Sequence, residues 1–133
     1  MNKPKTVTKA VKPLTCTVNR ATWARGKINV PDDMRADGQM NHLLNGDNTR
    51  CCLGFLGAAC GVPDEFMLDT AMPDSLPPED FAKYPSLEKT GNRMRWNIFA
   101  ALNDDPNLSE VDREAKLRNT AKENGFRFRF TGK

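Results

Sequence analysis

Four cysteines and one histidine are the side chains in this 133-residue sequence that could supply a nucleophile and a base. Cys51 and Cys52 stand where a predicted strand passes into a predicted helix, and the dipole at a helix N-terminus lowers the pKa of a thiol. His42 is the base within reach, because a tight turn between them would place it near Cys51. This pattern suggests a cysteine-dependent enzyme. The alternative, which we favour, is that both cysteines are small buried hydrophobic side chains.

Metal and cofactor chemistry is not indicated by the spacing of these residues. Zinc ligands usually follow a C-x(2–4)-C pattern, whereas this chain has CC-x7-C. A ligand set can be drawn only by combining distant positions, namely Cys16, His42, Cys52 and Cys60. The glycine-rich loops that bind nucleotide phosphates are absent from the sequence. No two carboxylates are spaced to face one bond. We therefore predict no metal, no cofactor and a protein that is not an enzyme.

Anion binding is the other chemistry that the sequence offers. Arg127 and Arg129 alternate with phenylalanines, so they would share the solvent face of a strand. Arg50 would lie close to them if that strand paired with residues 40–52. Arginine suits such a site because its planar guanidinium binds phosphate or carboxylate through two hydrogen bonds. We name these three arginines as candidate ligand-binding residues for a small anionic ligand.

Charge is spread unevenly along the chain. Residues 1–27 hold seven basic side chains and no acid, residues 28–91 carry a net charge of −7, and residues 92–133 carry +3. A basic arm ahead of an acidic region could hold nucleic acid or an acidic partner. The acidic region would repel DNA, so we rank a basic-arm nucleic-acid-binding protein below binding of a protein or a small anionic ligand.

No apolar run approaches the roughly 20 residues that a membrane-spanning helix needs. The basic N-terminus also lacks the apolar core and cleavage site of a secretory leader. We therefore expect no membrane partner and a cytoplasmic location.

The predicted fold is a single α+β domain over residues 19–133. It follows a basic lead-in over residues 1–18 that is extended or partly disordered, because two prolines and scattered valines cannot form a helix there. Asn45-Gly46 between short apolar runs favours a hairpin over residues 40–52. Further strands are expected at residues 126–130 and 15–18. We expect these strands to form a small antiparallel sheet.

That sheet is expected to pack around a short buried helix at residues 52–60. The segment is apolar or small on every side of a helical wheel, which is typical of a helix in the middle of a core. Gly54 and Gly57 each lower helix propensity by about 1 kcal/mol, which indicates that another element approaches the helix backbone closely. A proline-rich acidic loop follows at residues 69–91, with one helical turn expected near residues 79–83.

The remaining predicted helices are amphipathic or short. The expected segments are residues 20–25, 64–68, 93–103 and 109–124. Trp23 should anchor the first of them to the core, and a Ser109 capping box should open the last. For residues 93–103 we predict an apolar stripe with two aromatic residues beside it, namely Met94, Ile98, Ala101 and Leu102 with Trp96 and Phe99. For residues 109–124 we predict a surface helix that packs through one narrow face, namely Val111, Ala115 and Leu117.

Several short motifs occur in an order that resembles a known group of proteins. CCLG at residues 51–54 is preceded by NGD at residues 45–47 and followed by LND at residues 102–104. A Trp-x-x-Gly pattern, WARG, occupies residues 23–26. Across residues 20–124 this order resembles small bacteriophage accessory proteins with a CCLG signature. CCLG is the distinctive motif among the four.

The resemblance implies a phage accessory protein in the host cytoplasm, and it brings no catalytic residues with it. We therefore expect a non-enzymatic protein that binds a host factor or a small anionic signal and counteracts host defence. The group usually continues CCLGVLC, and this chain has Gly57 where that further cysteine falls. This departure argues against a metal or redox role at that position.

Overall fold

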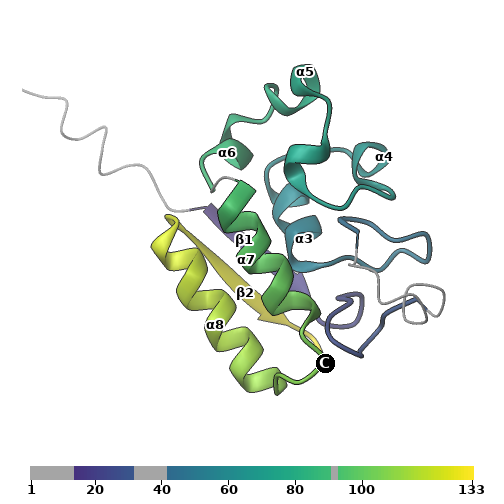
Figure 1. The fold of residues 1–133 in the computed structure, drawn as a ribbon, viewed down its shortest axis with the longest axis vertical. Coiled ribbons are helices and arrows are strands. Elements are labelled where there is room, and N and C mark those ends of the chain that lie inside the picture. Colours follow the sequence, from purple (N-terminus) through teal and green to yellow (C-terminus); the bar gives the residue numbers. More distant parts are fainter. Residues whose placement is uncertain (1–13, 32–41, 91–92) are drawn as a thin grey trace, which may run out of the picture.

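The structure, a computed structural model, describes residues 14–31, 42–90 and 93–133 (Figure 1). The described residues form an α+β fold with six α-helices and two strands. In chain order the elements are β1 (Leu14–Asn19), α3 (Cys52–Ala59), α4 (Asp64–Met67), the 3-10 turn η1 (Pro73–Ser75), α5 (Pro78–Phe81), α6 (Pro85–Glu88), α7 (Arg93–Asp104), α8 (Glu110–Glu123) and β2 (Phe126–Thr131). The first 13 residues of the predicted lead-in lie outside the described residues, and its last five belong to β1. No helix in the described segments is long and apolar enough to cross a bilayer.

The two strands pair in parallel, from Leu14 opposite Phe126 to Asn19 opposite Thr131. Our prediction of an antiparallel sheet built on a hairpin is therefore wrong. Residues 42–51 do reverse direction, but the two arms form bridges with other segments, Leu44 with Leu68 and Arg50 with Trp23. The predicted Asn-Gly turn forms without a hairpin ladder; residues 40 and 41 lie outside the described part of the chain.

Side chains, rather than a ladder, help to close that turn. Asn45 is buried, its Oδ1 accepts the backbone N–H of His42 at 3.1 Å, and its Nδ2 donates to the hydroxyl of Thr49 at 3.1 Å. The backbone N–H of Asn45 donates to the carbonyl of Thr49 at 2.8 Å. The turn is thus self-contained, and its two arms are free to pair elsewhere.

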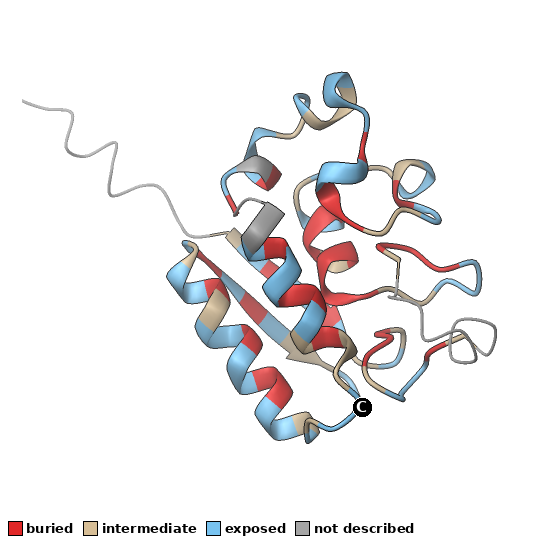
Figure 2. Cartoon of the chain, viewed as in Figure 1, coloured by how far each residue is buried: buried red, intermediate tan, exposed pale blue. Residues whose placement is uncertain are grey.

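One face of the sheet is buried and the other is open to solvent. Cys16, Val18, Phe126 and Phe128 lie on the buried face beneath the helices, and α7 and α8 lie in front of the sheet (Figures 1 and 2). The side chains of the opposite face, which are exposed and which we call the open sheet face, are Thr15, Thr17, Asn19, Arg127 and Arg129. Parallel sheets usually have both faces covered, so this one is unusual.

Helix α3 lies against the buried face, as predicted, and its glycines mark close approaches. A Cβ on Gly54 would overlap the backbone carbonyl of Leu43, and one on Gly57 would lie 2.7 Å from the Met67 sulfur. The prediction that other elements approach this helix is therefore confirmed. The helix is buried on one side only, because Ala58 and Ala59 are exposed.

The apolar faces predicted for α7 and α8 are correct only in part. Leu117, Trp96 and Phe99 are buried, as predicted, whereas Ile98 and Val111 are exposed. The Met94 side chain lies outside the described part of the chain. On α7 the buried residues are Trp96, Phe99, Ala100 and Asn103, whereas Ile98 is 44% exposed. On α8 they are Arg113, Glu114, Leu117 and Ala121, whereas Val111 is 78% exposed. Charged side chains with partners thus replace some of the apolar residues that we expected. The predicted cap is confirmed, since the Ser109 hydroxyl accepts the N–H of Asp112 at 3.1 Å.

The segment expected to form a helix at residues 20–25 is a turn instead. Trp23 is fully buried, as predicted, but the backbone N–H groups of Ala24 and Arg25 donate to the carbonyls of Arg50 and Ile28 rather than to carbonyls four residues earlier. The Arg25 guanidinium donates to the carbonyls of Arg20 at 3.0 Å and of Trp23 at 2.7 Å, and it lies 4.6 Å from the Trp23 ring centroid. Side-chain bonds to these carbonyls take the place of helical ones.

Candidate functional site

Three of the recognised motifs meet at one buried side chain. Asn103, from LND, accepts the indole N–H of Trp23 at 2.7 Å and the backbone N–H of Cys52 at 2.9 Å. Its amide donates to the carbonyl of Ala24 at 2.9 Å, and to the Asp104 carboxylate at 2.9 Å. Asn103 is fully buried. The WARG, CCLG and LND motifs are therefore joined by hydrogen bonds inside the core and do not form an exposed site.

The candidate nucleophiles, Cys51 and Cys52, are buried in the same part of the core. Cys51 and Cys52 are 2% and 0% exposed, and the Cys52 thiol is directed at the carbonyl of Phe99, 3.7 Å away. Burial raises the pKa of Cys51 to about 12 and the pKa of Cys52 well above its usual value. The backbone N–H groups at the start of α3 act in the opposite direction on the pKa of Cys51, but burial outweighs them. Such thiols are protonated and poorly nucleophilic near neutral pH.

His42 lies beside Cys51 only through the backbone. The Cys51 N–H donates to the His42 carbonyl at 3.3 Å, while the His42 Nδ1 lies 3.7 Å from a carboxylate oxygen of the exposed Asp69. Within the described residues, no group of three or more histidine, cysteine or acidic side chains is arranged to hold a metal ion. Neither finding supports a thiol or metal centre here.

Alkylation of the thiols tests this arrangement. In the native state at about pH 7.5 we expect N-ethylmaleimide to modify at most Cys60, slowly, because that thiol is only half-buried and its burial raises the pKa to about 11. In urea all four cysteines should react, as counted by intact mass. Fast native modification of Cys51 or Cys52 that His42→Ala slows would instead indicate a cysteine-dependent enzyme.

The three candidate arginines do not form a common site. Arg50 binds the carboxylate of Asp64 at 2.8 Å and belongs to the segment that pairs with Trp23. Arg127 and Arg129 project from β2, whose partner is β1 rather than residues 42–51. The strand pairing that would have brought Arg50 close to Arg127 and Arg129 therefore does not occur. Arg127 and Arg129 share one face of the strand, as expected from the alternation.

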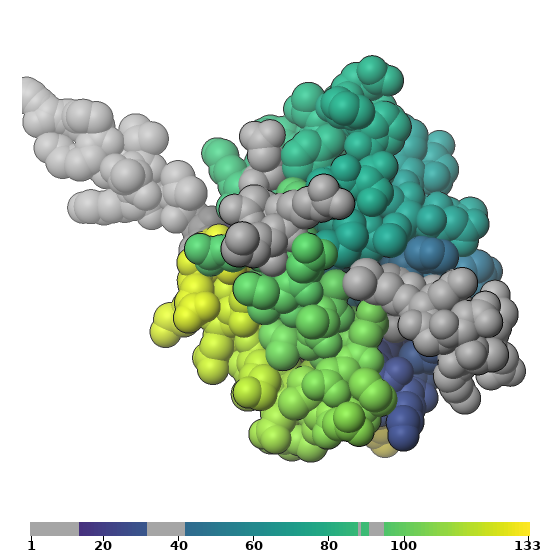
Figure 3. Space-filling model, in the orientation of Figure 1, coloured from purple at the N-terminus to yellow at the C-terminus, as the bar shows by residue number. Residues whose placement is uncertain are grey.

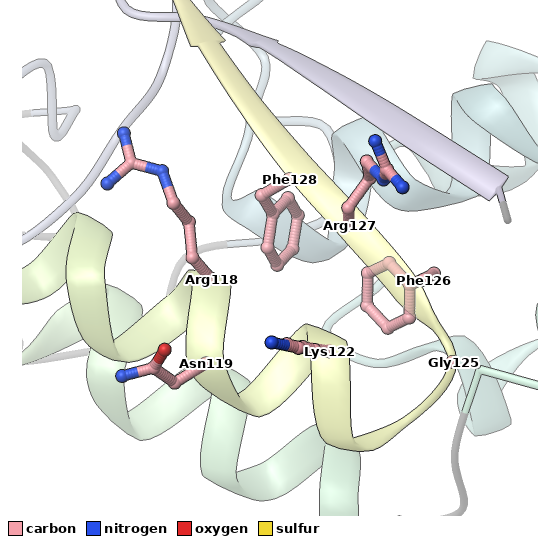
Figure 4. A pocket seen from close by; sticks show the side chains of 7 residues that line it. All are labelled: Arg118, Asn119, Lys122, Gly125, Phe126, Arg127 and Phe128. Atoms are coloured by element: carbon pink, nitrogen blue, oxygen red, sulfur yellow. The ribbon is translucent and has the colours of Figure 1, made fainter.

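A groove of about 580 Å³ separates α8 from β2 (Figure 4). Its lining residues, which define what we call the α8–β2 groove, are Arg118, Asn119, Lys122, Gly125, Phe126, Arg127 and Phe128. Gly125 has a φ of +83°, a left-handed conformation that glycine adopts without strain, and it turns the chain from the end of α8 into β2. The helix and strand thereby become the two walls of the groove.

The cationic wall of the groove is contributed by α8. The Lys122 side chain is exposed and has no hydrogen-bond or ion-pair partner in the part of the chain that the structure describes. Arg118 lies 3.3 Å from the Glu114 carboxylate, but Glu114 is already bound by Arg20 through two bonds of 2.8 Å. Those bonds hold the pKa of Glu114 below its usual value. One carboxylate between two guanidinium groups leaves excess positive charge at the groove.

The opposite wall is aromatic. The rings of Phe126 and Phe128 lie in the space between strand and helix (Figure 4), their centroids 5.3 Å apart. The Arg127 guanidinium projects from the other side of β2 in the same view, so it belongs to the open sheet face more than to the groove.

Arg118 and Lys122 were not among the residues predicted from the sequence. Their four-residue spacing places both side chains on one face of the helix, because residues i and i+4 are neighbours there. The sequence does not show that this face of the helix lies beside β2.

Comparisons of the chain with protein-family models, with curated proteins and with solved structures found no match. What this protein binds must therefore be inferred from its own side chains.

Proposed function

We propose that this chain is a non-enzymatic phage accessory protein that binds a small anionic ligand in the α8–β2 groove. The observation that carries the proposal is the pairing of an under-neutralised cationic wall, Arg118 and Lys122, with an aromatic wall, Phe126 and Phe128. The groove volume of about 580 Å³ lies within the usual range for small-molecule sites. A ligand with an anionic group and a planar apolar part, such as a nucleotide, matches both walls.

The setting that we propose, host cytoplasm and interference with host defence, is supported by the motif order that resembles small phage proteins. The buried thiols favour binding over cysteine chemistry. A large host protein is a less suitable partner for the described surface. Its exposed large apolar residues are scattered over separate segments, namely Ile28, Leu68, Ile98 and Val111, and protein interfaces usually need a cluster of apolar anchors.

Calorimetric titration with nucleoside monophosphates and diphosphates tests the groove. Lys122→Gln should weaken binding by about tenfold or more, because a hydrogen bond to a charged group contributes about 1.5–3 kcal/mol. Arg118→Gln should act in the same direction. Both side chains are exposed, so the melting temperature should stay close to that of the unsubstituted protein.

Lys89→Gln is the matched control, since Lys89 is an exposed lysine after α6 and outside the groove. It should leave the affinity unchanged. Two results would contradict the proposal: no binding of any nucleotide at millimolar concentration, or equal affinity for Lys122→Gln, Arg118→Gln and the unsubstituted protein.

A further inference from the structure

The open sheet face has a chemical character of its own, distinct from the groove. Its exposed side chains are two arginines from β2 and, from β1, two threonines and one asparagine. The register places Thr15 opposite Arg127 and Thr17 opposite Arg129. The face therefore presents a row of two hydroxyl groups on β1 beside a row of two guanidinium groups on β2. Its five residues include neither a carboxylate nor an apolar side chain.

Neither arginine of this face has a neutralising carboxylate in the part of the chain that the structure describes. Within the described residues, Arg127 and Arg129 make no ion pair or side-chain hydrogen bond, whereas Arg20, Arg25, Arg50 and Arg113 all bind carboxylates. Residues two apart on a strand project from the same face about 6.6 Å apart. Two unneutralised guanidinium groups at that interval suit successive charges on a polyanion better than a single small anion.

The acidic region that we expected to repel nucleic acid lies elsewhere in the fold. Residues 64–80 carry six acids and no base, whereas residues 116–133 carry six bases and one acid. The acidic stretch covers α4, η1 and α5, and it lies at the opposite end of the molecule from α8 and β2 (Figures 1 and 3). The open sheet face is thus on the basic side of a polarised molecule.

We propose that the open sheet face binds single-stranded nucleic acid through its phosphates. A peptide partner is disfavoured because the face has no apolar side chain to anchor it, whereas phosphate binding needs only charge and hydrogen-bond donors. The Thr15 and Thr17 hydroxyls can donate to phosphate oxygens alongside the two guanidinium groups. With no exposed aromatic ring on the face, base stacking is absent and recognition is independent of sequence. This proposal stands apart from the small ligand of the groove.

Fluorescence anisotropy with a labelled oligonucleotide of about 12 nucleotides tests the proposal. The affinity of the full chain should fall steeply as salt rises from about 50 to about 200 mM. In the double variant Arg127→Gln/Arg129→Gln, the slope of log K against log salt should become shallower by about 1.4, since each phosphate contact on a single strand contributes about 0.7. Affinity at about 0.1 M salt should drop by about tenfold to thirtyfold. The melting temperature should not change, because both side chains are exposed.

Four further measurements separate the alternatives. Arg129→Gln alone should weaken oligonucleotide binding and leave nucleotide binding in the groove intact, while Lys89→Gln should alter neither. Lys122→Gln should do the reverse of Arg129→Gln, so failure of the groove and failure of the sheet face are distinguishable. A duplex of equal length should bind more weakly than single-stranded nucleic acid. The reason is that a face made of β1 and β2 alone is narrow and can contact only one sugar-phosphate backbone.

The proposal is overturned by any of three results. The first is retention of affinity and salt slope by the double variant. The second is the absence of salt-dependent oligonucleotide binding. The third is equal affinity for a poly-glutamate peptide of the same charge, which would assign the face to acidic peptides instead.

Discussion

Replacing Gly54 with alanine should cost about 4 kcal/mol or more of unfolding free energy, a large share of the total stability of the protein. The added Cβ would overlap the carbonyl of Leu43, a backbone group that cannot move without displacing its own segment. A domain of this size has only about 5–15 kcal/mol of stability in total. Urea denaturation followed by circular dichroism measures the loss.

Two other glycines provide graded controls for this substitution. A Cβ on Gly46 would meet nothing within 4 Å, so Gly46→Ala should change stability by no more than about 0.5 kcal/mol. Gly57→Ala should fall between the two, because the atom in its way is the flexible end of the Met67 side chain. Equal stability of the Gly54 and Gly46 variants would mean that α3 does not pack against the Leu43 carbonyl.

Removal of the Asn103 side chain is expected to have the second largest effect, about 3–5 kcal/mol. Asn103→Ala leaves the Trp23 indole N–H, the Cys52 N–H and the Ala24 carbonyl without their partner, and each unsatisfied buried group costs about 1–3 kcal/mol, not fully additively. Thermal or urea denaturation, monitored by tryptophan fluorescence, would measure the change. Asn97→Ala, at an exposed position on the same helix, should be nearly neutral.

Asn103→Asp sharpens that test through its pH dependence. At neutral pH the carboxylate would still accept from Trp23 and Cys52, but it would lose the bond to the Ala24 carbonyl and lie beside Asp104. Burial raises the pKa of such a carboxyl, and the protonated form regains a donor. The variant should therefore recover part of its stability, relative to the unsubstituted protein, as the pH falls through that raised pKa. A pH-independent deficit would contradict the hydrogen-bonding role.

Local patterns predicted much of the secondary structure. The alternation of phenylalanine and arginine predicted strand β2, and the capping box at Ser109 predicted the start of α8. The glycines of α3 predicted that other segments approach its backbone closely. These features depend on residues that are adjacent in sequence or in one element. The physics that fixes them is therefore visible without the tertiary structure.

Features that depend on distant partners were not predicted. Periodicity shows that a segment is a strand but not which strand it pairs with, so the parallel pairing of β1 with β2 was missed. The sequence around Glu114 likewise does not indicate that Arg20, 94 positions earlier, donates two hydrogen bonds to its carboxylate. The same limit applies to the sites. Arg127 and Arg129 were named from their own strand, whereas Arg118 and Lys122 required the position of α8 beside β2.

The pairing of the first described strand with the last has a consequence for synthesis. Leu14 and Phe126 are 112 positions apart, so a chain emerging from the ribosome cannot complete its sheet until residues 126–131 have emerged. Until then β1 lacks its only strand partner among the described residues, and Cys16 and Val18 have no Phe126 or Phe128 beside them. Nascent chains stalled before residue 126 should therefore be sensitive to protease and recruit chaperones. The synthesis of β2 is thus the step that completes the sheet.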